Sequence, residues 1–281
     1  MPHYDDRVTR LAKYLGGLAD ENFAAVEKRK RRTQLKPSAT SSGVRRATLE
    51  QAVPGYAVRV PERGSAYKVI TPVENGSLRT AFTAAFASPD TPVQQRLLAR
   101  CKAIALPEDV LFVDIETTGL GQTPLFLIGV MTWEGDNLVV RQFLARDCHE
   151  EPAVIQLFAD LAAGKSFLIT FNGKSFDLPM IYQRAERLDV PCILHAHHFD
   201  LLHECRRVWQ PQLPNCQLQT LEQQICNHPP RDETVSSEQI PAVYEAFLRN
   251  GNALQLAQVM HHNVQDLVTM AELLVKLPAM E

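Results

Sequence analysis

Between Leu106 and the C-terminus, apolar residues form short runs separated by polar turns, and this pattern predicts a dense succession of strands and helices. Residues 134–137 include the Gly, Asp and Asn that suit a hairpin turn. In order, we expect strands at 111–116, 125–133 and 138–144, a helix at 150–163, a strand at 167–171, a helix from the 172–175 turn to about 187, a strand ending at Asp200, and helices to the end. Three antiparallel strands followed by alternating helix and strand describe an α/β fold with a mixed sheet flanked by helices.

The N-terminal third has a different pattern. Val8, Leu11 and Leu15 recur at three-and-four spacing and predict an amphipathic helix that ends in a basic run, and its apolar stripe packs on the protein's own body or on another chain. A segment rich in Lys, Pro, Ser, Thr and Gly follows, and alternating residues at 56–60 and 67–73 predict a hairpin. The expected domains are an amphipathic basic helix at 1–33, a linker at 34–52, a small strand-containing extension at 53–104 that packs on the main domain, and the main domain at 105–281.

The composition is that of a folded protein. With 281 residues, of which 45% are hydrophobic and 22% charged, the chain can bury a sizeable core, which excludes disorder throughout. No apolar run approaches the ~20 residues of a membrane helix, and Met1–Arg10 carries charges where a signal peptide is apolar. We therefore expect a soluble, cytoplasmic protein without membrane contact. The six cysteines form no CxxC pair, which argues against a structural zinc site or a disulfide framework.

The charge is unevenly distributed along the chain. Residues 1–100 hold 17 Lys and Arg against 9 Asp and Glu, a net charge of +8, whereas the remainder holds 12 against 23, a net charge of −11. A basic arm suits a polyanion such as nucleic acid, but an acidic body repels that partner unless bound cations neutralise some of its carboxylates.

The strongest chemical signal is the segment FVDIETTGL at 112–120. On a strand, Asp114 and Glu116 project from one face while Val113 and Ile115 project from the other. Two carboxylates on an apolar strand need a counter-charge, and a divalent cation supplies one; the alternative is a strand end whose acids reach solvent. The turn that follows has a backbone that can approach a ligand, and its substrate-binding candidates are Thr117, Thr118, Gly119 and Leu120.

A third carboxylate lies in the segment FNGKSFDLP at 171–179. Asp177 stands at the start of a predicted helix, where it is either a helix cap or a metal ligand. Asn172 and Lys174, in the turn before it, are candidates for orienting a phosphate or sugar, and exposed loop residues are the alternative.

The segment HHNVQDLVTM at 261–270 supplies a fourth carboxylate, Asp266, together with a candidate general base. His262 precedes Asp266 by four residues and His261 precedes it by five. On a continuous helix only the four-residue spacing places both side chains on one face, which favours His262, whereas an irregular helix start would favour His261.

These motifs carry a family resemblance. DIE at 114–116, FD at 176–177 and the terminal His with Asp266 resemble the three motifs of DEDD-type 3′-to-5′ exonucleases. More narrowly, ETTGL, NGKSFDLP, HFDLLHECRRVW and HHNVQD resemble the YprB-type branch of ribonuclease H-like exonuclease domains. The resemblance covers roughly residues 105–276 and implies a ribonuclease H-like fold for the main domain.

The resemblance also implies a mechanism. Four carboxylates hold two Mg²⁺ or Mn²⁺ ions, one of which lowers the pKa of a water while the other stabilises the leaving 3′ oxygen. The implied metal ligands are Asp114, Glu116, Asp177 and Asp266, and His262 accepts the proton of the water. The implied function is hydrolysis of nucleic acid, DNA in preference to RNA, in DNA repair or processing.

Two alternatives stay open: an exoribonuclease, and a non-catalytic nucleic-acid or helicase adaptor. The N-terminal helix is also a candidate surface for a helicase or repair partner.

Overall fold

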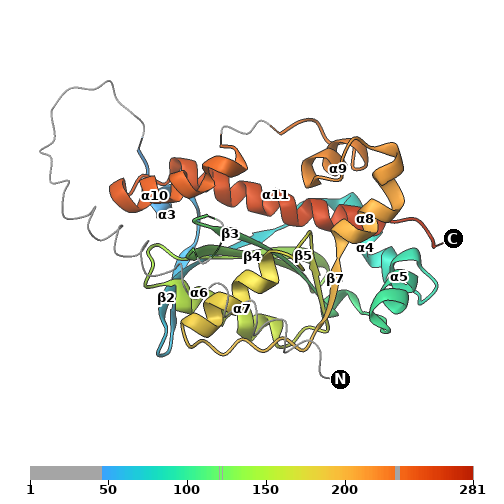
Figure 1. Cartoon of the computed structure of the whole chain (residues 1–281), viewed down its shortest axis with the longest axis horizontal. Helices are drawn as coiled ribbons and strands as arrows, with labels where there is room; N and C mark the ends of the chain where they lie inside the picture. The colour runs from blue at the N-terminus through green and yellow to red at the C-terminus, as the bar shows by residue number, and fades with distance from the viewer. Residues whose placement is uncertain (1–45, 120, 122, 232–234, 281) are drawn as a thin grey trace, which may run out of the picture. The chain divides into compact units, whose positions relative to one another are not determined.

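A seven-stranded mixed sheet is the central element of the computed structural model, which describes residues 46–119, 121, 123–231 and 235–280 (Figure 1). In chain order the strands are β1 Tyr56–Val60, β2 Gly64–Pro72, β3 Val110–Thr117, β4 Leu125–Glu134, β5 Asn137–Leu144, β6 Phe167–Thr170 and β7 His197–Asp200. Across the sheet they lie in the order β1-β2-β5-β4-β3-β6-β7. The mixed sheet predicted from the alternation of apolar and polar residues is thus confirmed.

Strand β3 stands where the two halves of the sheet meet. It pairs antiparallel with β4 on one side and parallel with β6 on the other. Beyond these neighbours, β4, β5 and β2 continue antiparallel, whereas β6 and β7 continue parallel. The side chains near the end of β3 therefore lie where the strand direction changes, which is the kind of place where open α/β sheets form ligand sites.

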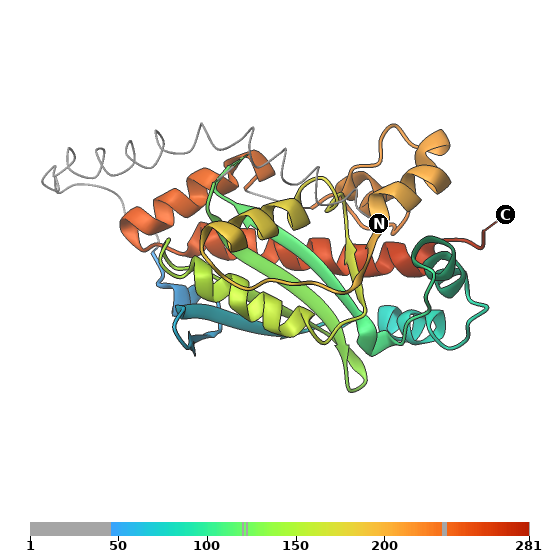
Figure 2. The ribbon, with the colours of Figure 1, turned by 60° about the horizontal axis from the view of Figure 1, so that its bottom comes forward.

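Helices cover both faces of the sheet. They are α3 Leu49–Ala52, α4 Gly76–Ala85, α5 Pro92–Cys101, α6 Glu151–Ala162, α7 Asp177–Arg187, α8 Leu201–Trp209, α9 Leu218–Gln224, α10 Ile240–Asn250 and α11 Leu254–Lys276, with single 3₁₀ turns η1 Pro107–Asp109, η2 Gln210–Gln212 and η3 Ser237–Gln239. Helix α11 lies along one face, and α6 and α7 lie on the other (Figures 1 and 2). No helix in the described part of the chain is long and apolar enough to cross a membrane.

The alternation along β3 divides the core into two layers. Val113 and Ile115 are buried in the layer that includes α6 and α7, whereas Phe112 is buried in the layer that includes the C-terminal half of α11. Asp114 and Glu116 follow Phe112 at intervals of two, so they project towards the α11 side. The expected separation of the acids from their apolar neighbours is confirmed.

The region before β3 differs from the expectation. The hairpin of β1 and β2, which we expected in a small extension that packs on the main domain, is joined to the sheet itself, because β2 pairs with β5. Helix α3 falls within the expected linker at 34–52. This segment is part of the fold, because Leu49 is buried in the core and Ala253 N–H donates to the carbonyl of Ala47. The helix expected at 1–33 and the linker as far as residue 45 lie outside the described residues.

One buried ion pair ties the two helices of a single face to the sheet. The guanidinium of Arg184, on α7, donates to both carboxylate oxygens of Glu151, on α6, at 2.6 Å. Glu151 also accepts the backbone N–H of Leu125, the first residue of β4, at 2.9 Å. Both side chains are almost fully buried. The pair therefore fixes α7, which begins at Asp177, relative to the sheet.

Candidate active site

Two of the predicted carboxylates lie near the end of β3. Asp114 and Glu116 are both partly buried on the strand face that looks towards α11. The pairing with β4 shifts register between Glu116 and Thr117. At Leu111 and Phe112, β3 pairs with both β4 and β6. Beyond Phe112 it pairs with β4 alone.

Asp177 is the first residue of α7 and is almost completely buried. Hydrogen bonding to the backbone at Asp177 and Ile115 lowers the pKa of its carboxyl, against the larger effect of burial.

The fourth carboxylate and the histidine lie on one face of α11. Because this helix is continuous from Leu254 to Lys276, His262 stands one turn before Asp266, with 3.3 Å between Nε2 and Oδ2. His261 is exposed. The continuous helix is the condition under which the sequence favoured His262.

The four carboxylates repel one another. Burial raises the pKa of Asp114 well above its usual range, and the negative charges of Asp266, Glu116 and Asp177 add to this effect. Burial likewise raises the pKa of Glu116 to about 8 and that of Asp177 to about 7, again with a contribution from Asp266. The amide of Asn263, on α11, donates to Oδ2 of Asp114 at 2.7 Å, and Asp266 stands one turn after Asn263, so β3 and α11 bring Asp114 and Asp266 to one region. The charges of Glu116 and Asp177 act on the same carboxyl of Asp114.

An arginine that the sequence analysis did not single out contacts this cluster. Arg231 follows α9, and its Nη2 lies 2.7 Å from Oδ1 of Asp266. Its Nε lies 2.6 Å from Oε2 of Glu222, a buried residue of α9, and its Nη1 lies 3.4 Å from Nδ1 of His262. Burial lowers the pKa of Arg231, but the carboxylates of Asp266 and Glu222 more than offset this and raise it overall.

The donor set fits divalent cations in its chemistry. In the side-chain arrangement observed for the described residues, no three of the His, Cys, Asp and Glu side chains form a group ready to hold a metal ion. The cluster is nevertheless all-oxygen, partly buried and electrostatically unfavourable without positive charge. Arg231 supplies one positive charge, at Asp266. Mg²⁺ or Mn²⁺ would supply more, and the ligands available to these ions are Asp114, Glu116, Asp177 and Asp266.

The turn after β3 is closed by its own hydroxyl groups. Thr117 and Thr123 each donate to the carbonyl of Gly119 at 2.7 Å, and Thr118 is bonded through its N–H to the carbonyl of Pro124 at 3.0 Å. The threonine hydroxyls therefore shape the loop. Leu120, the remaining candidate of this turn, lies outside the described residues.

The turn before α7 presents two candidates to solvent. Asn172 and Lys174 are both exposed, and their backbone N–H groups donate to the carboxylate of Asp200 at 2.9 and 3.0 Å. Asn172 adopts a positive φ of 66°. Asp200, which also caps α8 by accepting the N–H of Leu202, fixes the backbone of a turn whose side chains remain accessible.

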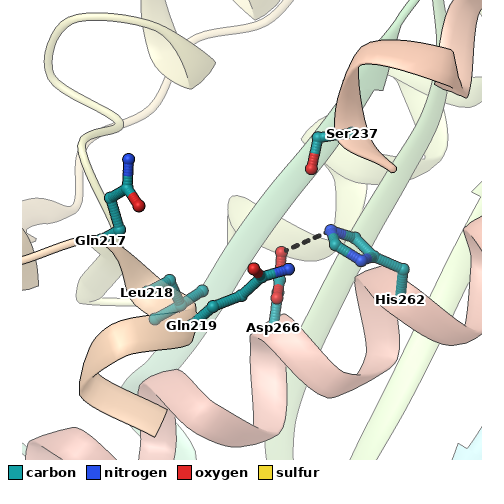
Figure 3. Close-up of a pocket in the computed structure, with 6 residues that line it drawn as sticks. All are labelled: Gln217, Leu218, Gln219, Ser237, His262 and Asp266. Carbon is teal, nitrogen blue, oxygen red and sulfur yellow. Dashed lines mark ion pairs between the residues drawn. The ribbon is translucent and has the colours of Figure 1, made fainter. Parts of the chain in front are cut away.

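A pocket of about 260 Å³ opens beside the histidine. His262 and Asp266 form one wall, and the other lining residues are Gln217, Leu218, Gln219 and Ser237 (Figure 3). Figure 3 shows the ion pair of His262 and Asp266 between the residues from α9 and the serine of η3. Asp266 is thus the carboxylate of the cluster that lines this pocket.

Three further residues of this region were not predicted from the sequence. Asn263 and Gln142 are buried and connect to Asp114 through hydrogen bonds. A signal for Gln142 exists, because the adjacent polar residues Arg141 and Gln142 interrupt the alternation of β5. Arg231 lies outside the helices and strands and offers no comparable signal.

Comparisons with known proteins agree with this architecture. The model of the RNase_H superfamily matches residues 111–278. The uncharacterized protein YprB of Bacillus subtilis (strain 168) is 32% identical over 170 residues, which cover 59% of this chain and 41% of that protein. The chain thus spans less than half the length of this relative. The expected YprB-type resemblance is confirmed.

A solved structure supports the fold. The family B DNA polymerase of the archaeon Pyrobaculum calidifontis matches with a TM-score of 0.50 and 17% identity, over 61% of this chain and 24% of that chain. At this identity the likeness concerns the fold alone. With a family model that matches well over half of its length, the chain belongs to the RNase H superfamily.

Proposed function

We propose that this chain is a metal-dependent 3′-to-5′ exonuclease that hydrolyses phosphodiester bonds of nucleic acid. The proposal is supported by the placement of Asp114 and Glu116 on the face of β3 towards α11, where Asp266 and the buried His262 lie 3.3 Å apart, with Asp177 at the start of α7. A nuclease-type hydrolase is also what membership of the RNase H superfamily supports, and nucleases of this superfamily generally use divalent metals. The direction of digestion, the role in DNA repair or processing and the preference for DNA rest on the resemblance to DEDD-type and YprB-type domains.

The cations proposed for this site are two Mg²⁺ or Mn²⁺ ions, held by Asp114, Glu116, Asp177 and Asp266. When bound, such ions activate water and stabilise charge on the phosphodiester. Without them, the ionised carboxylates would repel a phosphate group. The exposed side chains of Asn172 and Lys174, and the backbone of the turn after β3, are the groups that we assign to substrate contact.

His262 is the general base in this proposal, and its surroundings set a condition on that role. The guanidinium of Arg231 can only donate, so Nδ1 of His262 accepts and the ring proton lies on Nε2, which faces Asp266. In this arrangement Nε2 cannot take a proton. The nitrogen that can accept a proton is therefore Nδ1, which faces Arg231.

The proposal is tested by digestion of 5′-labelled single-stranded DNA, duplex DNA and RNA of matched sequence, with Mg²⁺ or Mn²⁺ and with a chelator. We expect the wild-type protein to shorten its substrate stepwise from the 3′ end. Asp114→Asn should lose at least ~100-fold in rate, because mutation of the outer partners of metal ligands already costs about 10-fold to 100-fold. Asp160→Asn, an exposed change on α6, is the matched control.

The other outcomes separate the alternatives. Faster digestion of RNA than of DNA would make the chain an exoribonuclease. Internal cleavage products would contradict exonuclease action, and an Asp114→Asn variant as active as the control would contradict the metal site. Binding of nucleic acid without metal-dependent hydrolysis would favour the non-catalytic adaptor.

The basic N-terminal region has its own test. We propose that residues 1–33 contact nucleic acid or a helicase or repair partner. Removal of residues 1–45 should weaken binding to long substrates and lower the salt dependence of that binding, while short substrates are still hydrolysed. Unchanged binding to long substrates at low salt would contradict contact with nucleic acid and leave the partner as the role of this region.

A further inference from the structure

Three residues stand opposite one another across the middle of the sheet. Asp114 on β3 is paired with Gly129 on β4, and Gly129 is paired with Gln142 on β5. Residues opposite one another in an antiparallel sheet project from the same face. Asp114 and Gln142 are therefore two polar side chains on one face, with a gap between them at Gly129.

Asn263 of α11 fills this gap. A Cβ atom at position 129 would lie 2.0 Å from Oδ1 and 2.7 Å from Nδ2 of Asn263, distances that no packing tolerates. Asn263 is completely buried, and its side chain is short. Glycine at 129 is thus required for the amide of Asn263 to lie against the sheet, between Asp114 and Gln142.

The amide connects the two neighbours in one direction only. Gln142 Nε2 donates to Oδ1 of Asn263 at 2.8 Å and to the carbonyl of Met260 at 2.8 Å. Asn263 Nδ2 then donates to Oδ2 of Asp114 at 2.7 Å and, more weakly, to its carbonyl at 3.3 Å. The carbonyl of Met260 can only accept, which turns Nε2 of Gln142 towards it and towards Oδ1 of Asn263, so Gln142 keeps the donor end of the Asn263 amide turned towards Asp114.

We infer that Asn263 is a positioning residue for Asp114, and that Gln142 and Gly129 hold Asn263 in that role. The amide binds Oδ2 of Asp114 and fixes the side-chain rotamer, while Oδ1 accepts no hydrogen bond from any residue that the structure describes. Asp114 thereby presents one oxygen to a cation, and less side-chain entropy is lost when the cation binds. The inference rests on the proposed function, because it concerns the cation site of that function.

The experiment measures Mn²⁺ affinity of the full chain by electron paramagnetic resonance, beside the kcat and KM of oligonucleotide digestion and the Tm. The variants are Asn263→Ala, which removes the amide, and Gly129→Ala, which displaces it. Gln142→Met removes the donor that orients the amide and conserves volume, so it tests the inference even where a change in α11 prevents folding. The matched control is Val130→Ala, a truncation on the opposite face of β4 that lies in the other core layer.

We expect Asn263→Ala and Gly129→Ala to weaken Mn²⁺ binding by about 10-fold to 100-fold and to lower kcat with little change in KM, as for other partners of metal ligands. Gln142→Met should act in the same direction with a smaller effect. Val130→Ala should lower the Tm and leave the affinity for Mn²⁺ unchanged, because it does not touch Asp114.

Two results would overturn the inference. If the variants at 263, 129 and 142 bind Mn²⁺ as tightly as Val130→Ala does, the network serves only to attach α11 to the sheet, and the proposed function is unaffected. If the wild-type chain binds no Mn²⁺ at all, the proposed function fails together with the inference.

Discussion

Arg231 and Asp266 form an ion pair in which Nη2 and Oδ1 are 2.7 Å apart, with both side chains largely buried. Glu222 binds Nε of the arginine, so the guanidinium faces Asp266 in a defined orientation. It partly neutralises a cluster in which four carboxylates repel one another. Its guanidinium and a cation at Asp266 would therefore compete for the same oxygen.

This competition can be tested with Arg231→Met. In the absence of divalent ions, we expect the variant to unfold at lower urea concentration, with a loss of about 3 kcal/mol, because Asp266 and Glu222 lose a buried partner. Addition of Mn²⁺ should stabilise the variant more than the wild-type chain, since a ligand that meets no competitor binds more tightly. Equal stabilisation of both proteins by Mn²⁺ would contradict the competition. Arg206→Met, an exposed change on α8, controls for loss of charge alone.

The raised pKa values predict how the metal-free protein responds to pH. Glu116 has a pKa of about 8 when folded, against its usual 4.5, and Asp177 has one of about 7, against 3.8. At a pH between its usual pKa and its pKa in the folded protein, each group keeps a proton in the folded state that it has released in the unfolded state. The free energy of unfolding therefore falls as the pH rises through this window, by up to about 1.4 kcal/mol per pH unit for each retained proton, and the contribution is fully present only at low pH.

Urea unfolding in a chelator, from about pH 5 to pH 8, measures this slope. Glu116→Gln removes one of the titrating groups and should make the slope shallower by the equivalent of about one proton. The exposed Glu186→Gln on α7 should leave it unchanged. A slope that is the same in the wild type and in Glu116→Gln would show that the carboxylate of Glu116 is ionised in the folded protein.

Asp200 is expected to control the turn that carries Asn172 and Lys174. Its carboxylate accepts both of their backbone N–H groups and also that of Leu202, so Asp200→Ala leaves donors without their charged acceptor. We expect a loss of about 2 to 3 kcal/mol in stability. Hydrogen exchange at the amides of Asn172 and Lys174 should accelerate more than the loss of global stability explains. Exchange that rises only in proportion to that loss would mean that Asp200 does not hold the turn, and Asp160→Ala is the control.

The ion pair of Glu151 and Arg184 is expected to matter for stability. Arg184→Met would leave the carboxylate of Glu151 buried without its bidentate partner, at a cost of about 3 to 5 kcal/mol. Urea unfolding measures this loss. A loss below ~1 kcal/mol would show that water or another donor replaces the guanidinium, and Glu186→Gln on the same helix is the control for charge.

The sequence predicted the main sheet well because its strands are short apolar runs bounded by turn residues. The strands β3 to β6 begin and end within one residue of their expected bounds, and β7 ends at the expected residue, Asp200. The hairpin of β1 and β2 was recognised as strands, but its position was not. Pairing between β2 and β5 joins segments about seventy residues apart, and periodicity within a segment carries no information on such a partner.

The residues of the candidate site likewise fall into those that local spacing predicts and those that it does not. Asp114, Glu116 and the pair His262 and Asp266 follow from local spacing, because periods of two and of four fix their common faces. Asn263 and Arg231 do not, because their importance depends on residues far away in the chain, Asp114 and Glu222 with Asp266. Neither of these contacts can be predicted from the local pattern of apolar and polar residues.

Helix α11 carries Asn263 and Asp266 on a single rigid rod, and each residue in an α-helix is rotated by about 100° from the one before it. An insertion of one residue between Leu254 and His262 would turn the rest of the helix by that angle about its axis. Asn263 would then leave the space above Gly129, and Asp266 would leave the carboxylate cluster. The rotation of this helix about its own axis therefore decides which side chains reach the site. Insertions and deletions before His262 preserve that rotation best when they add or remove close to a whole number of helical turns.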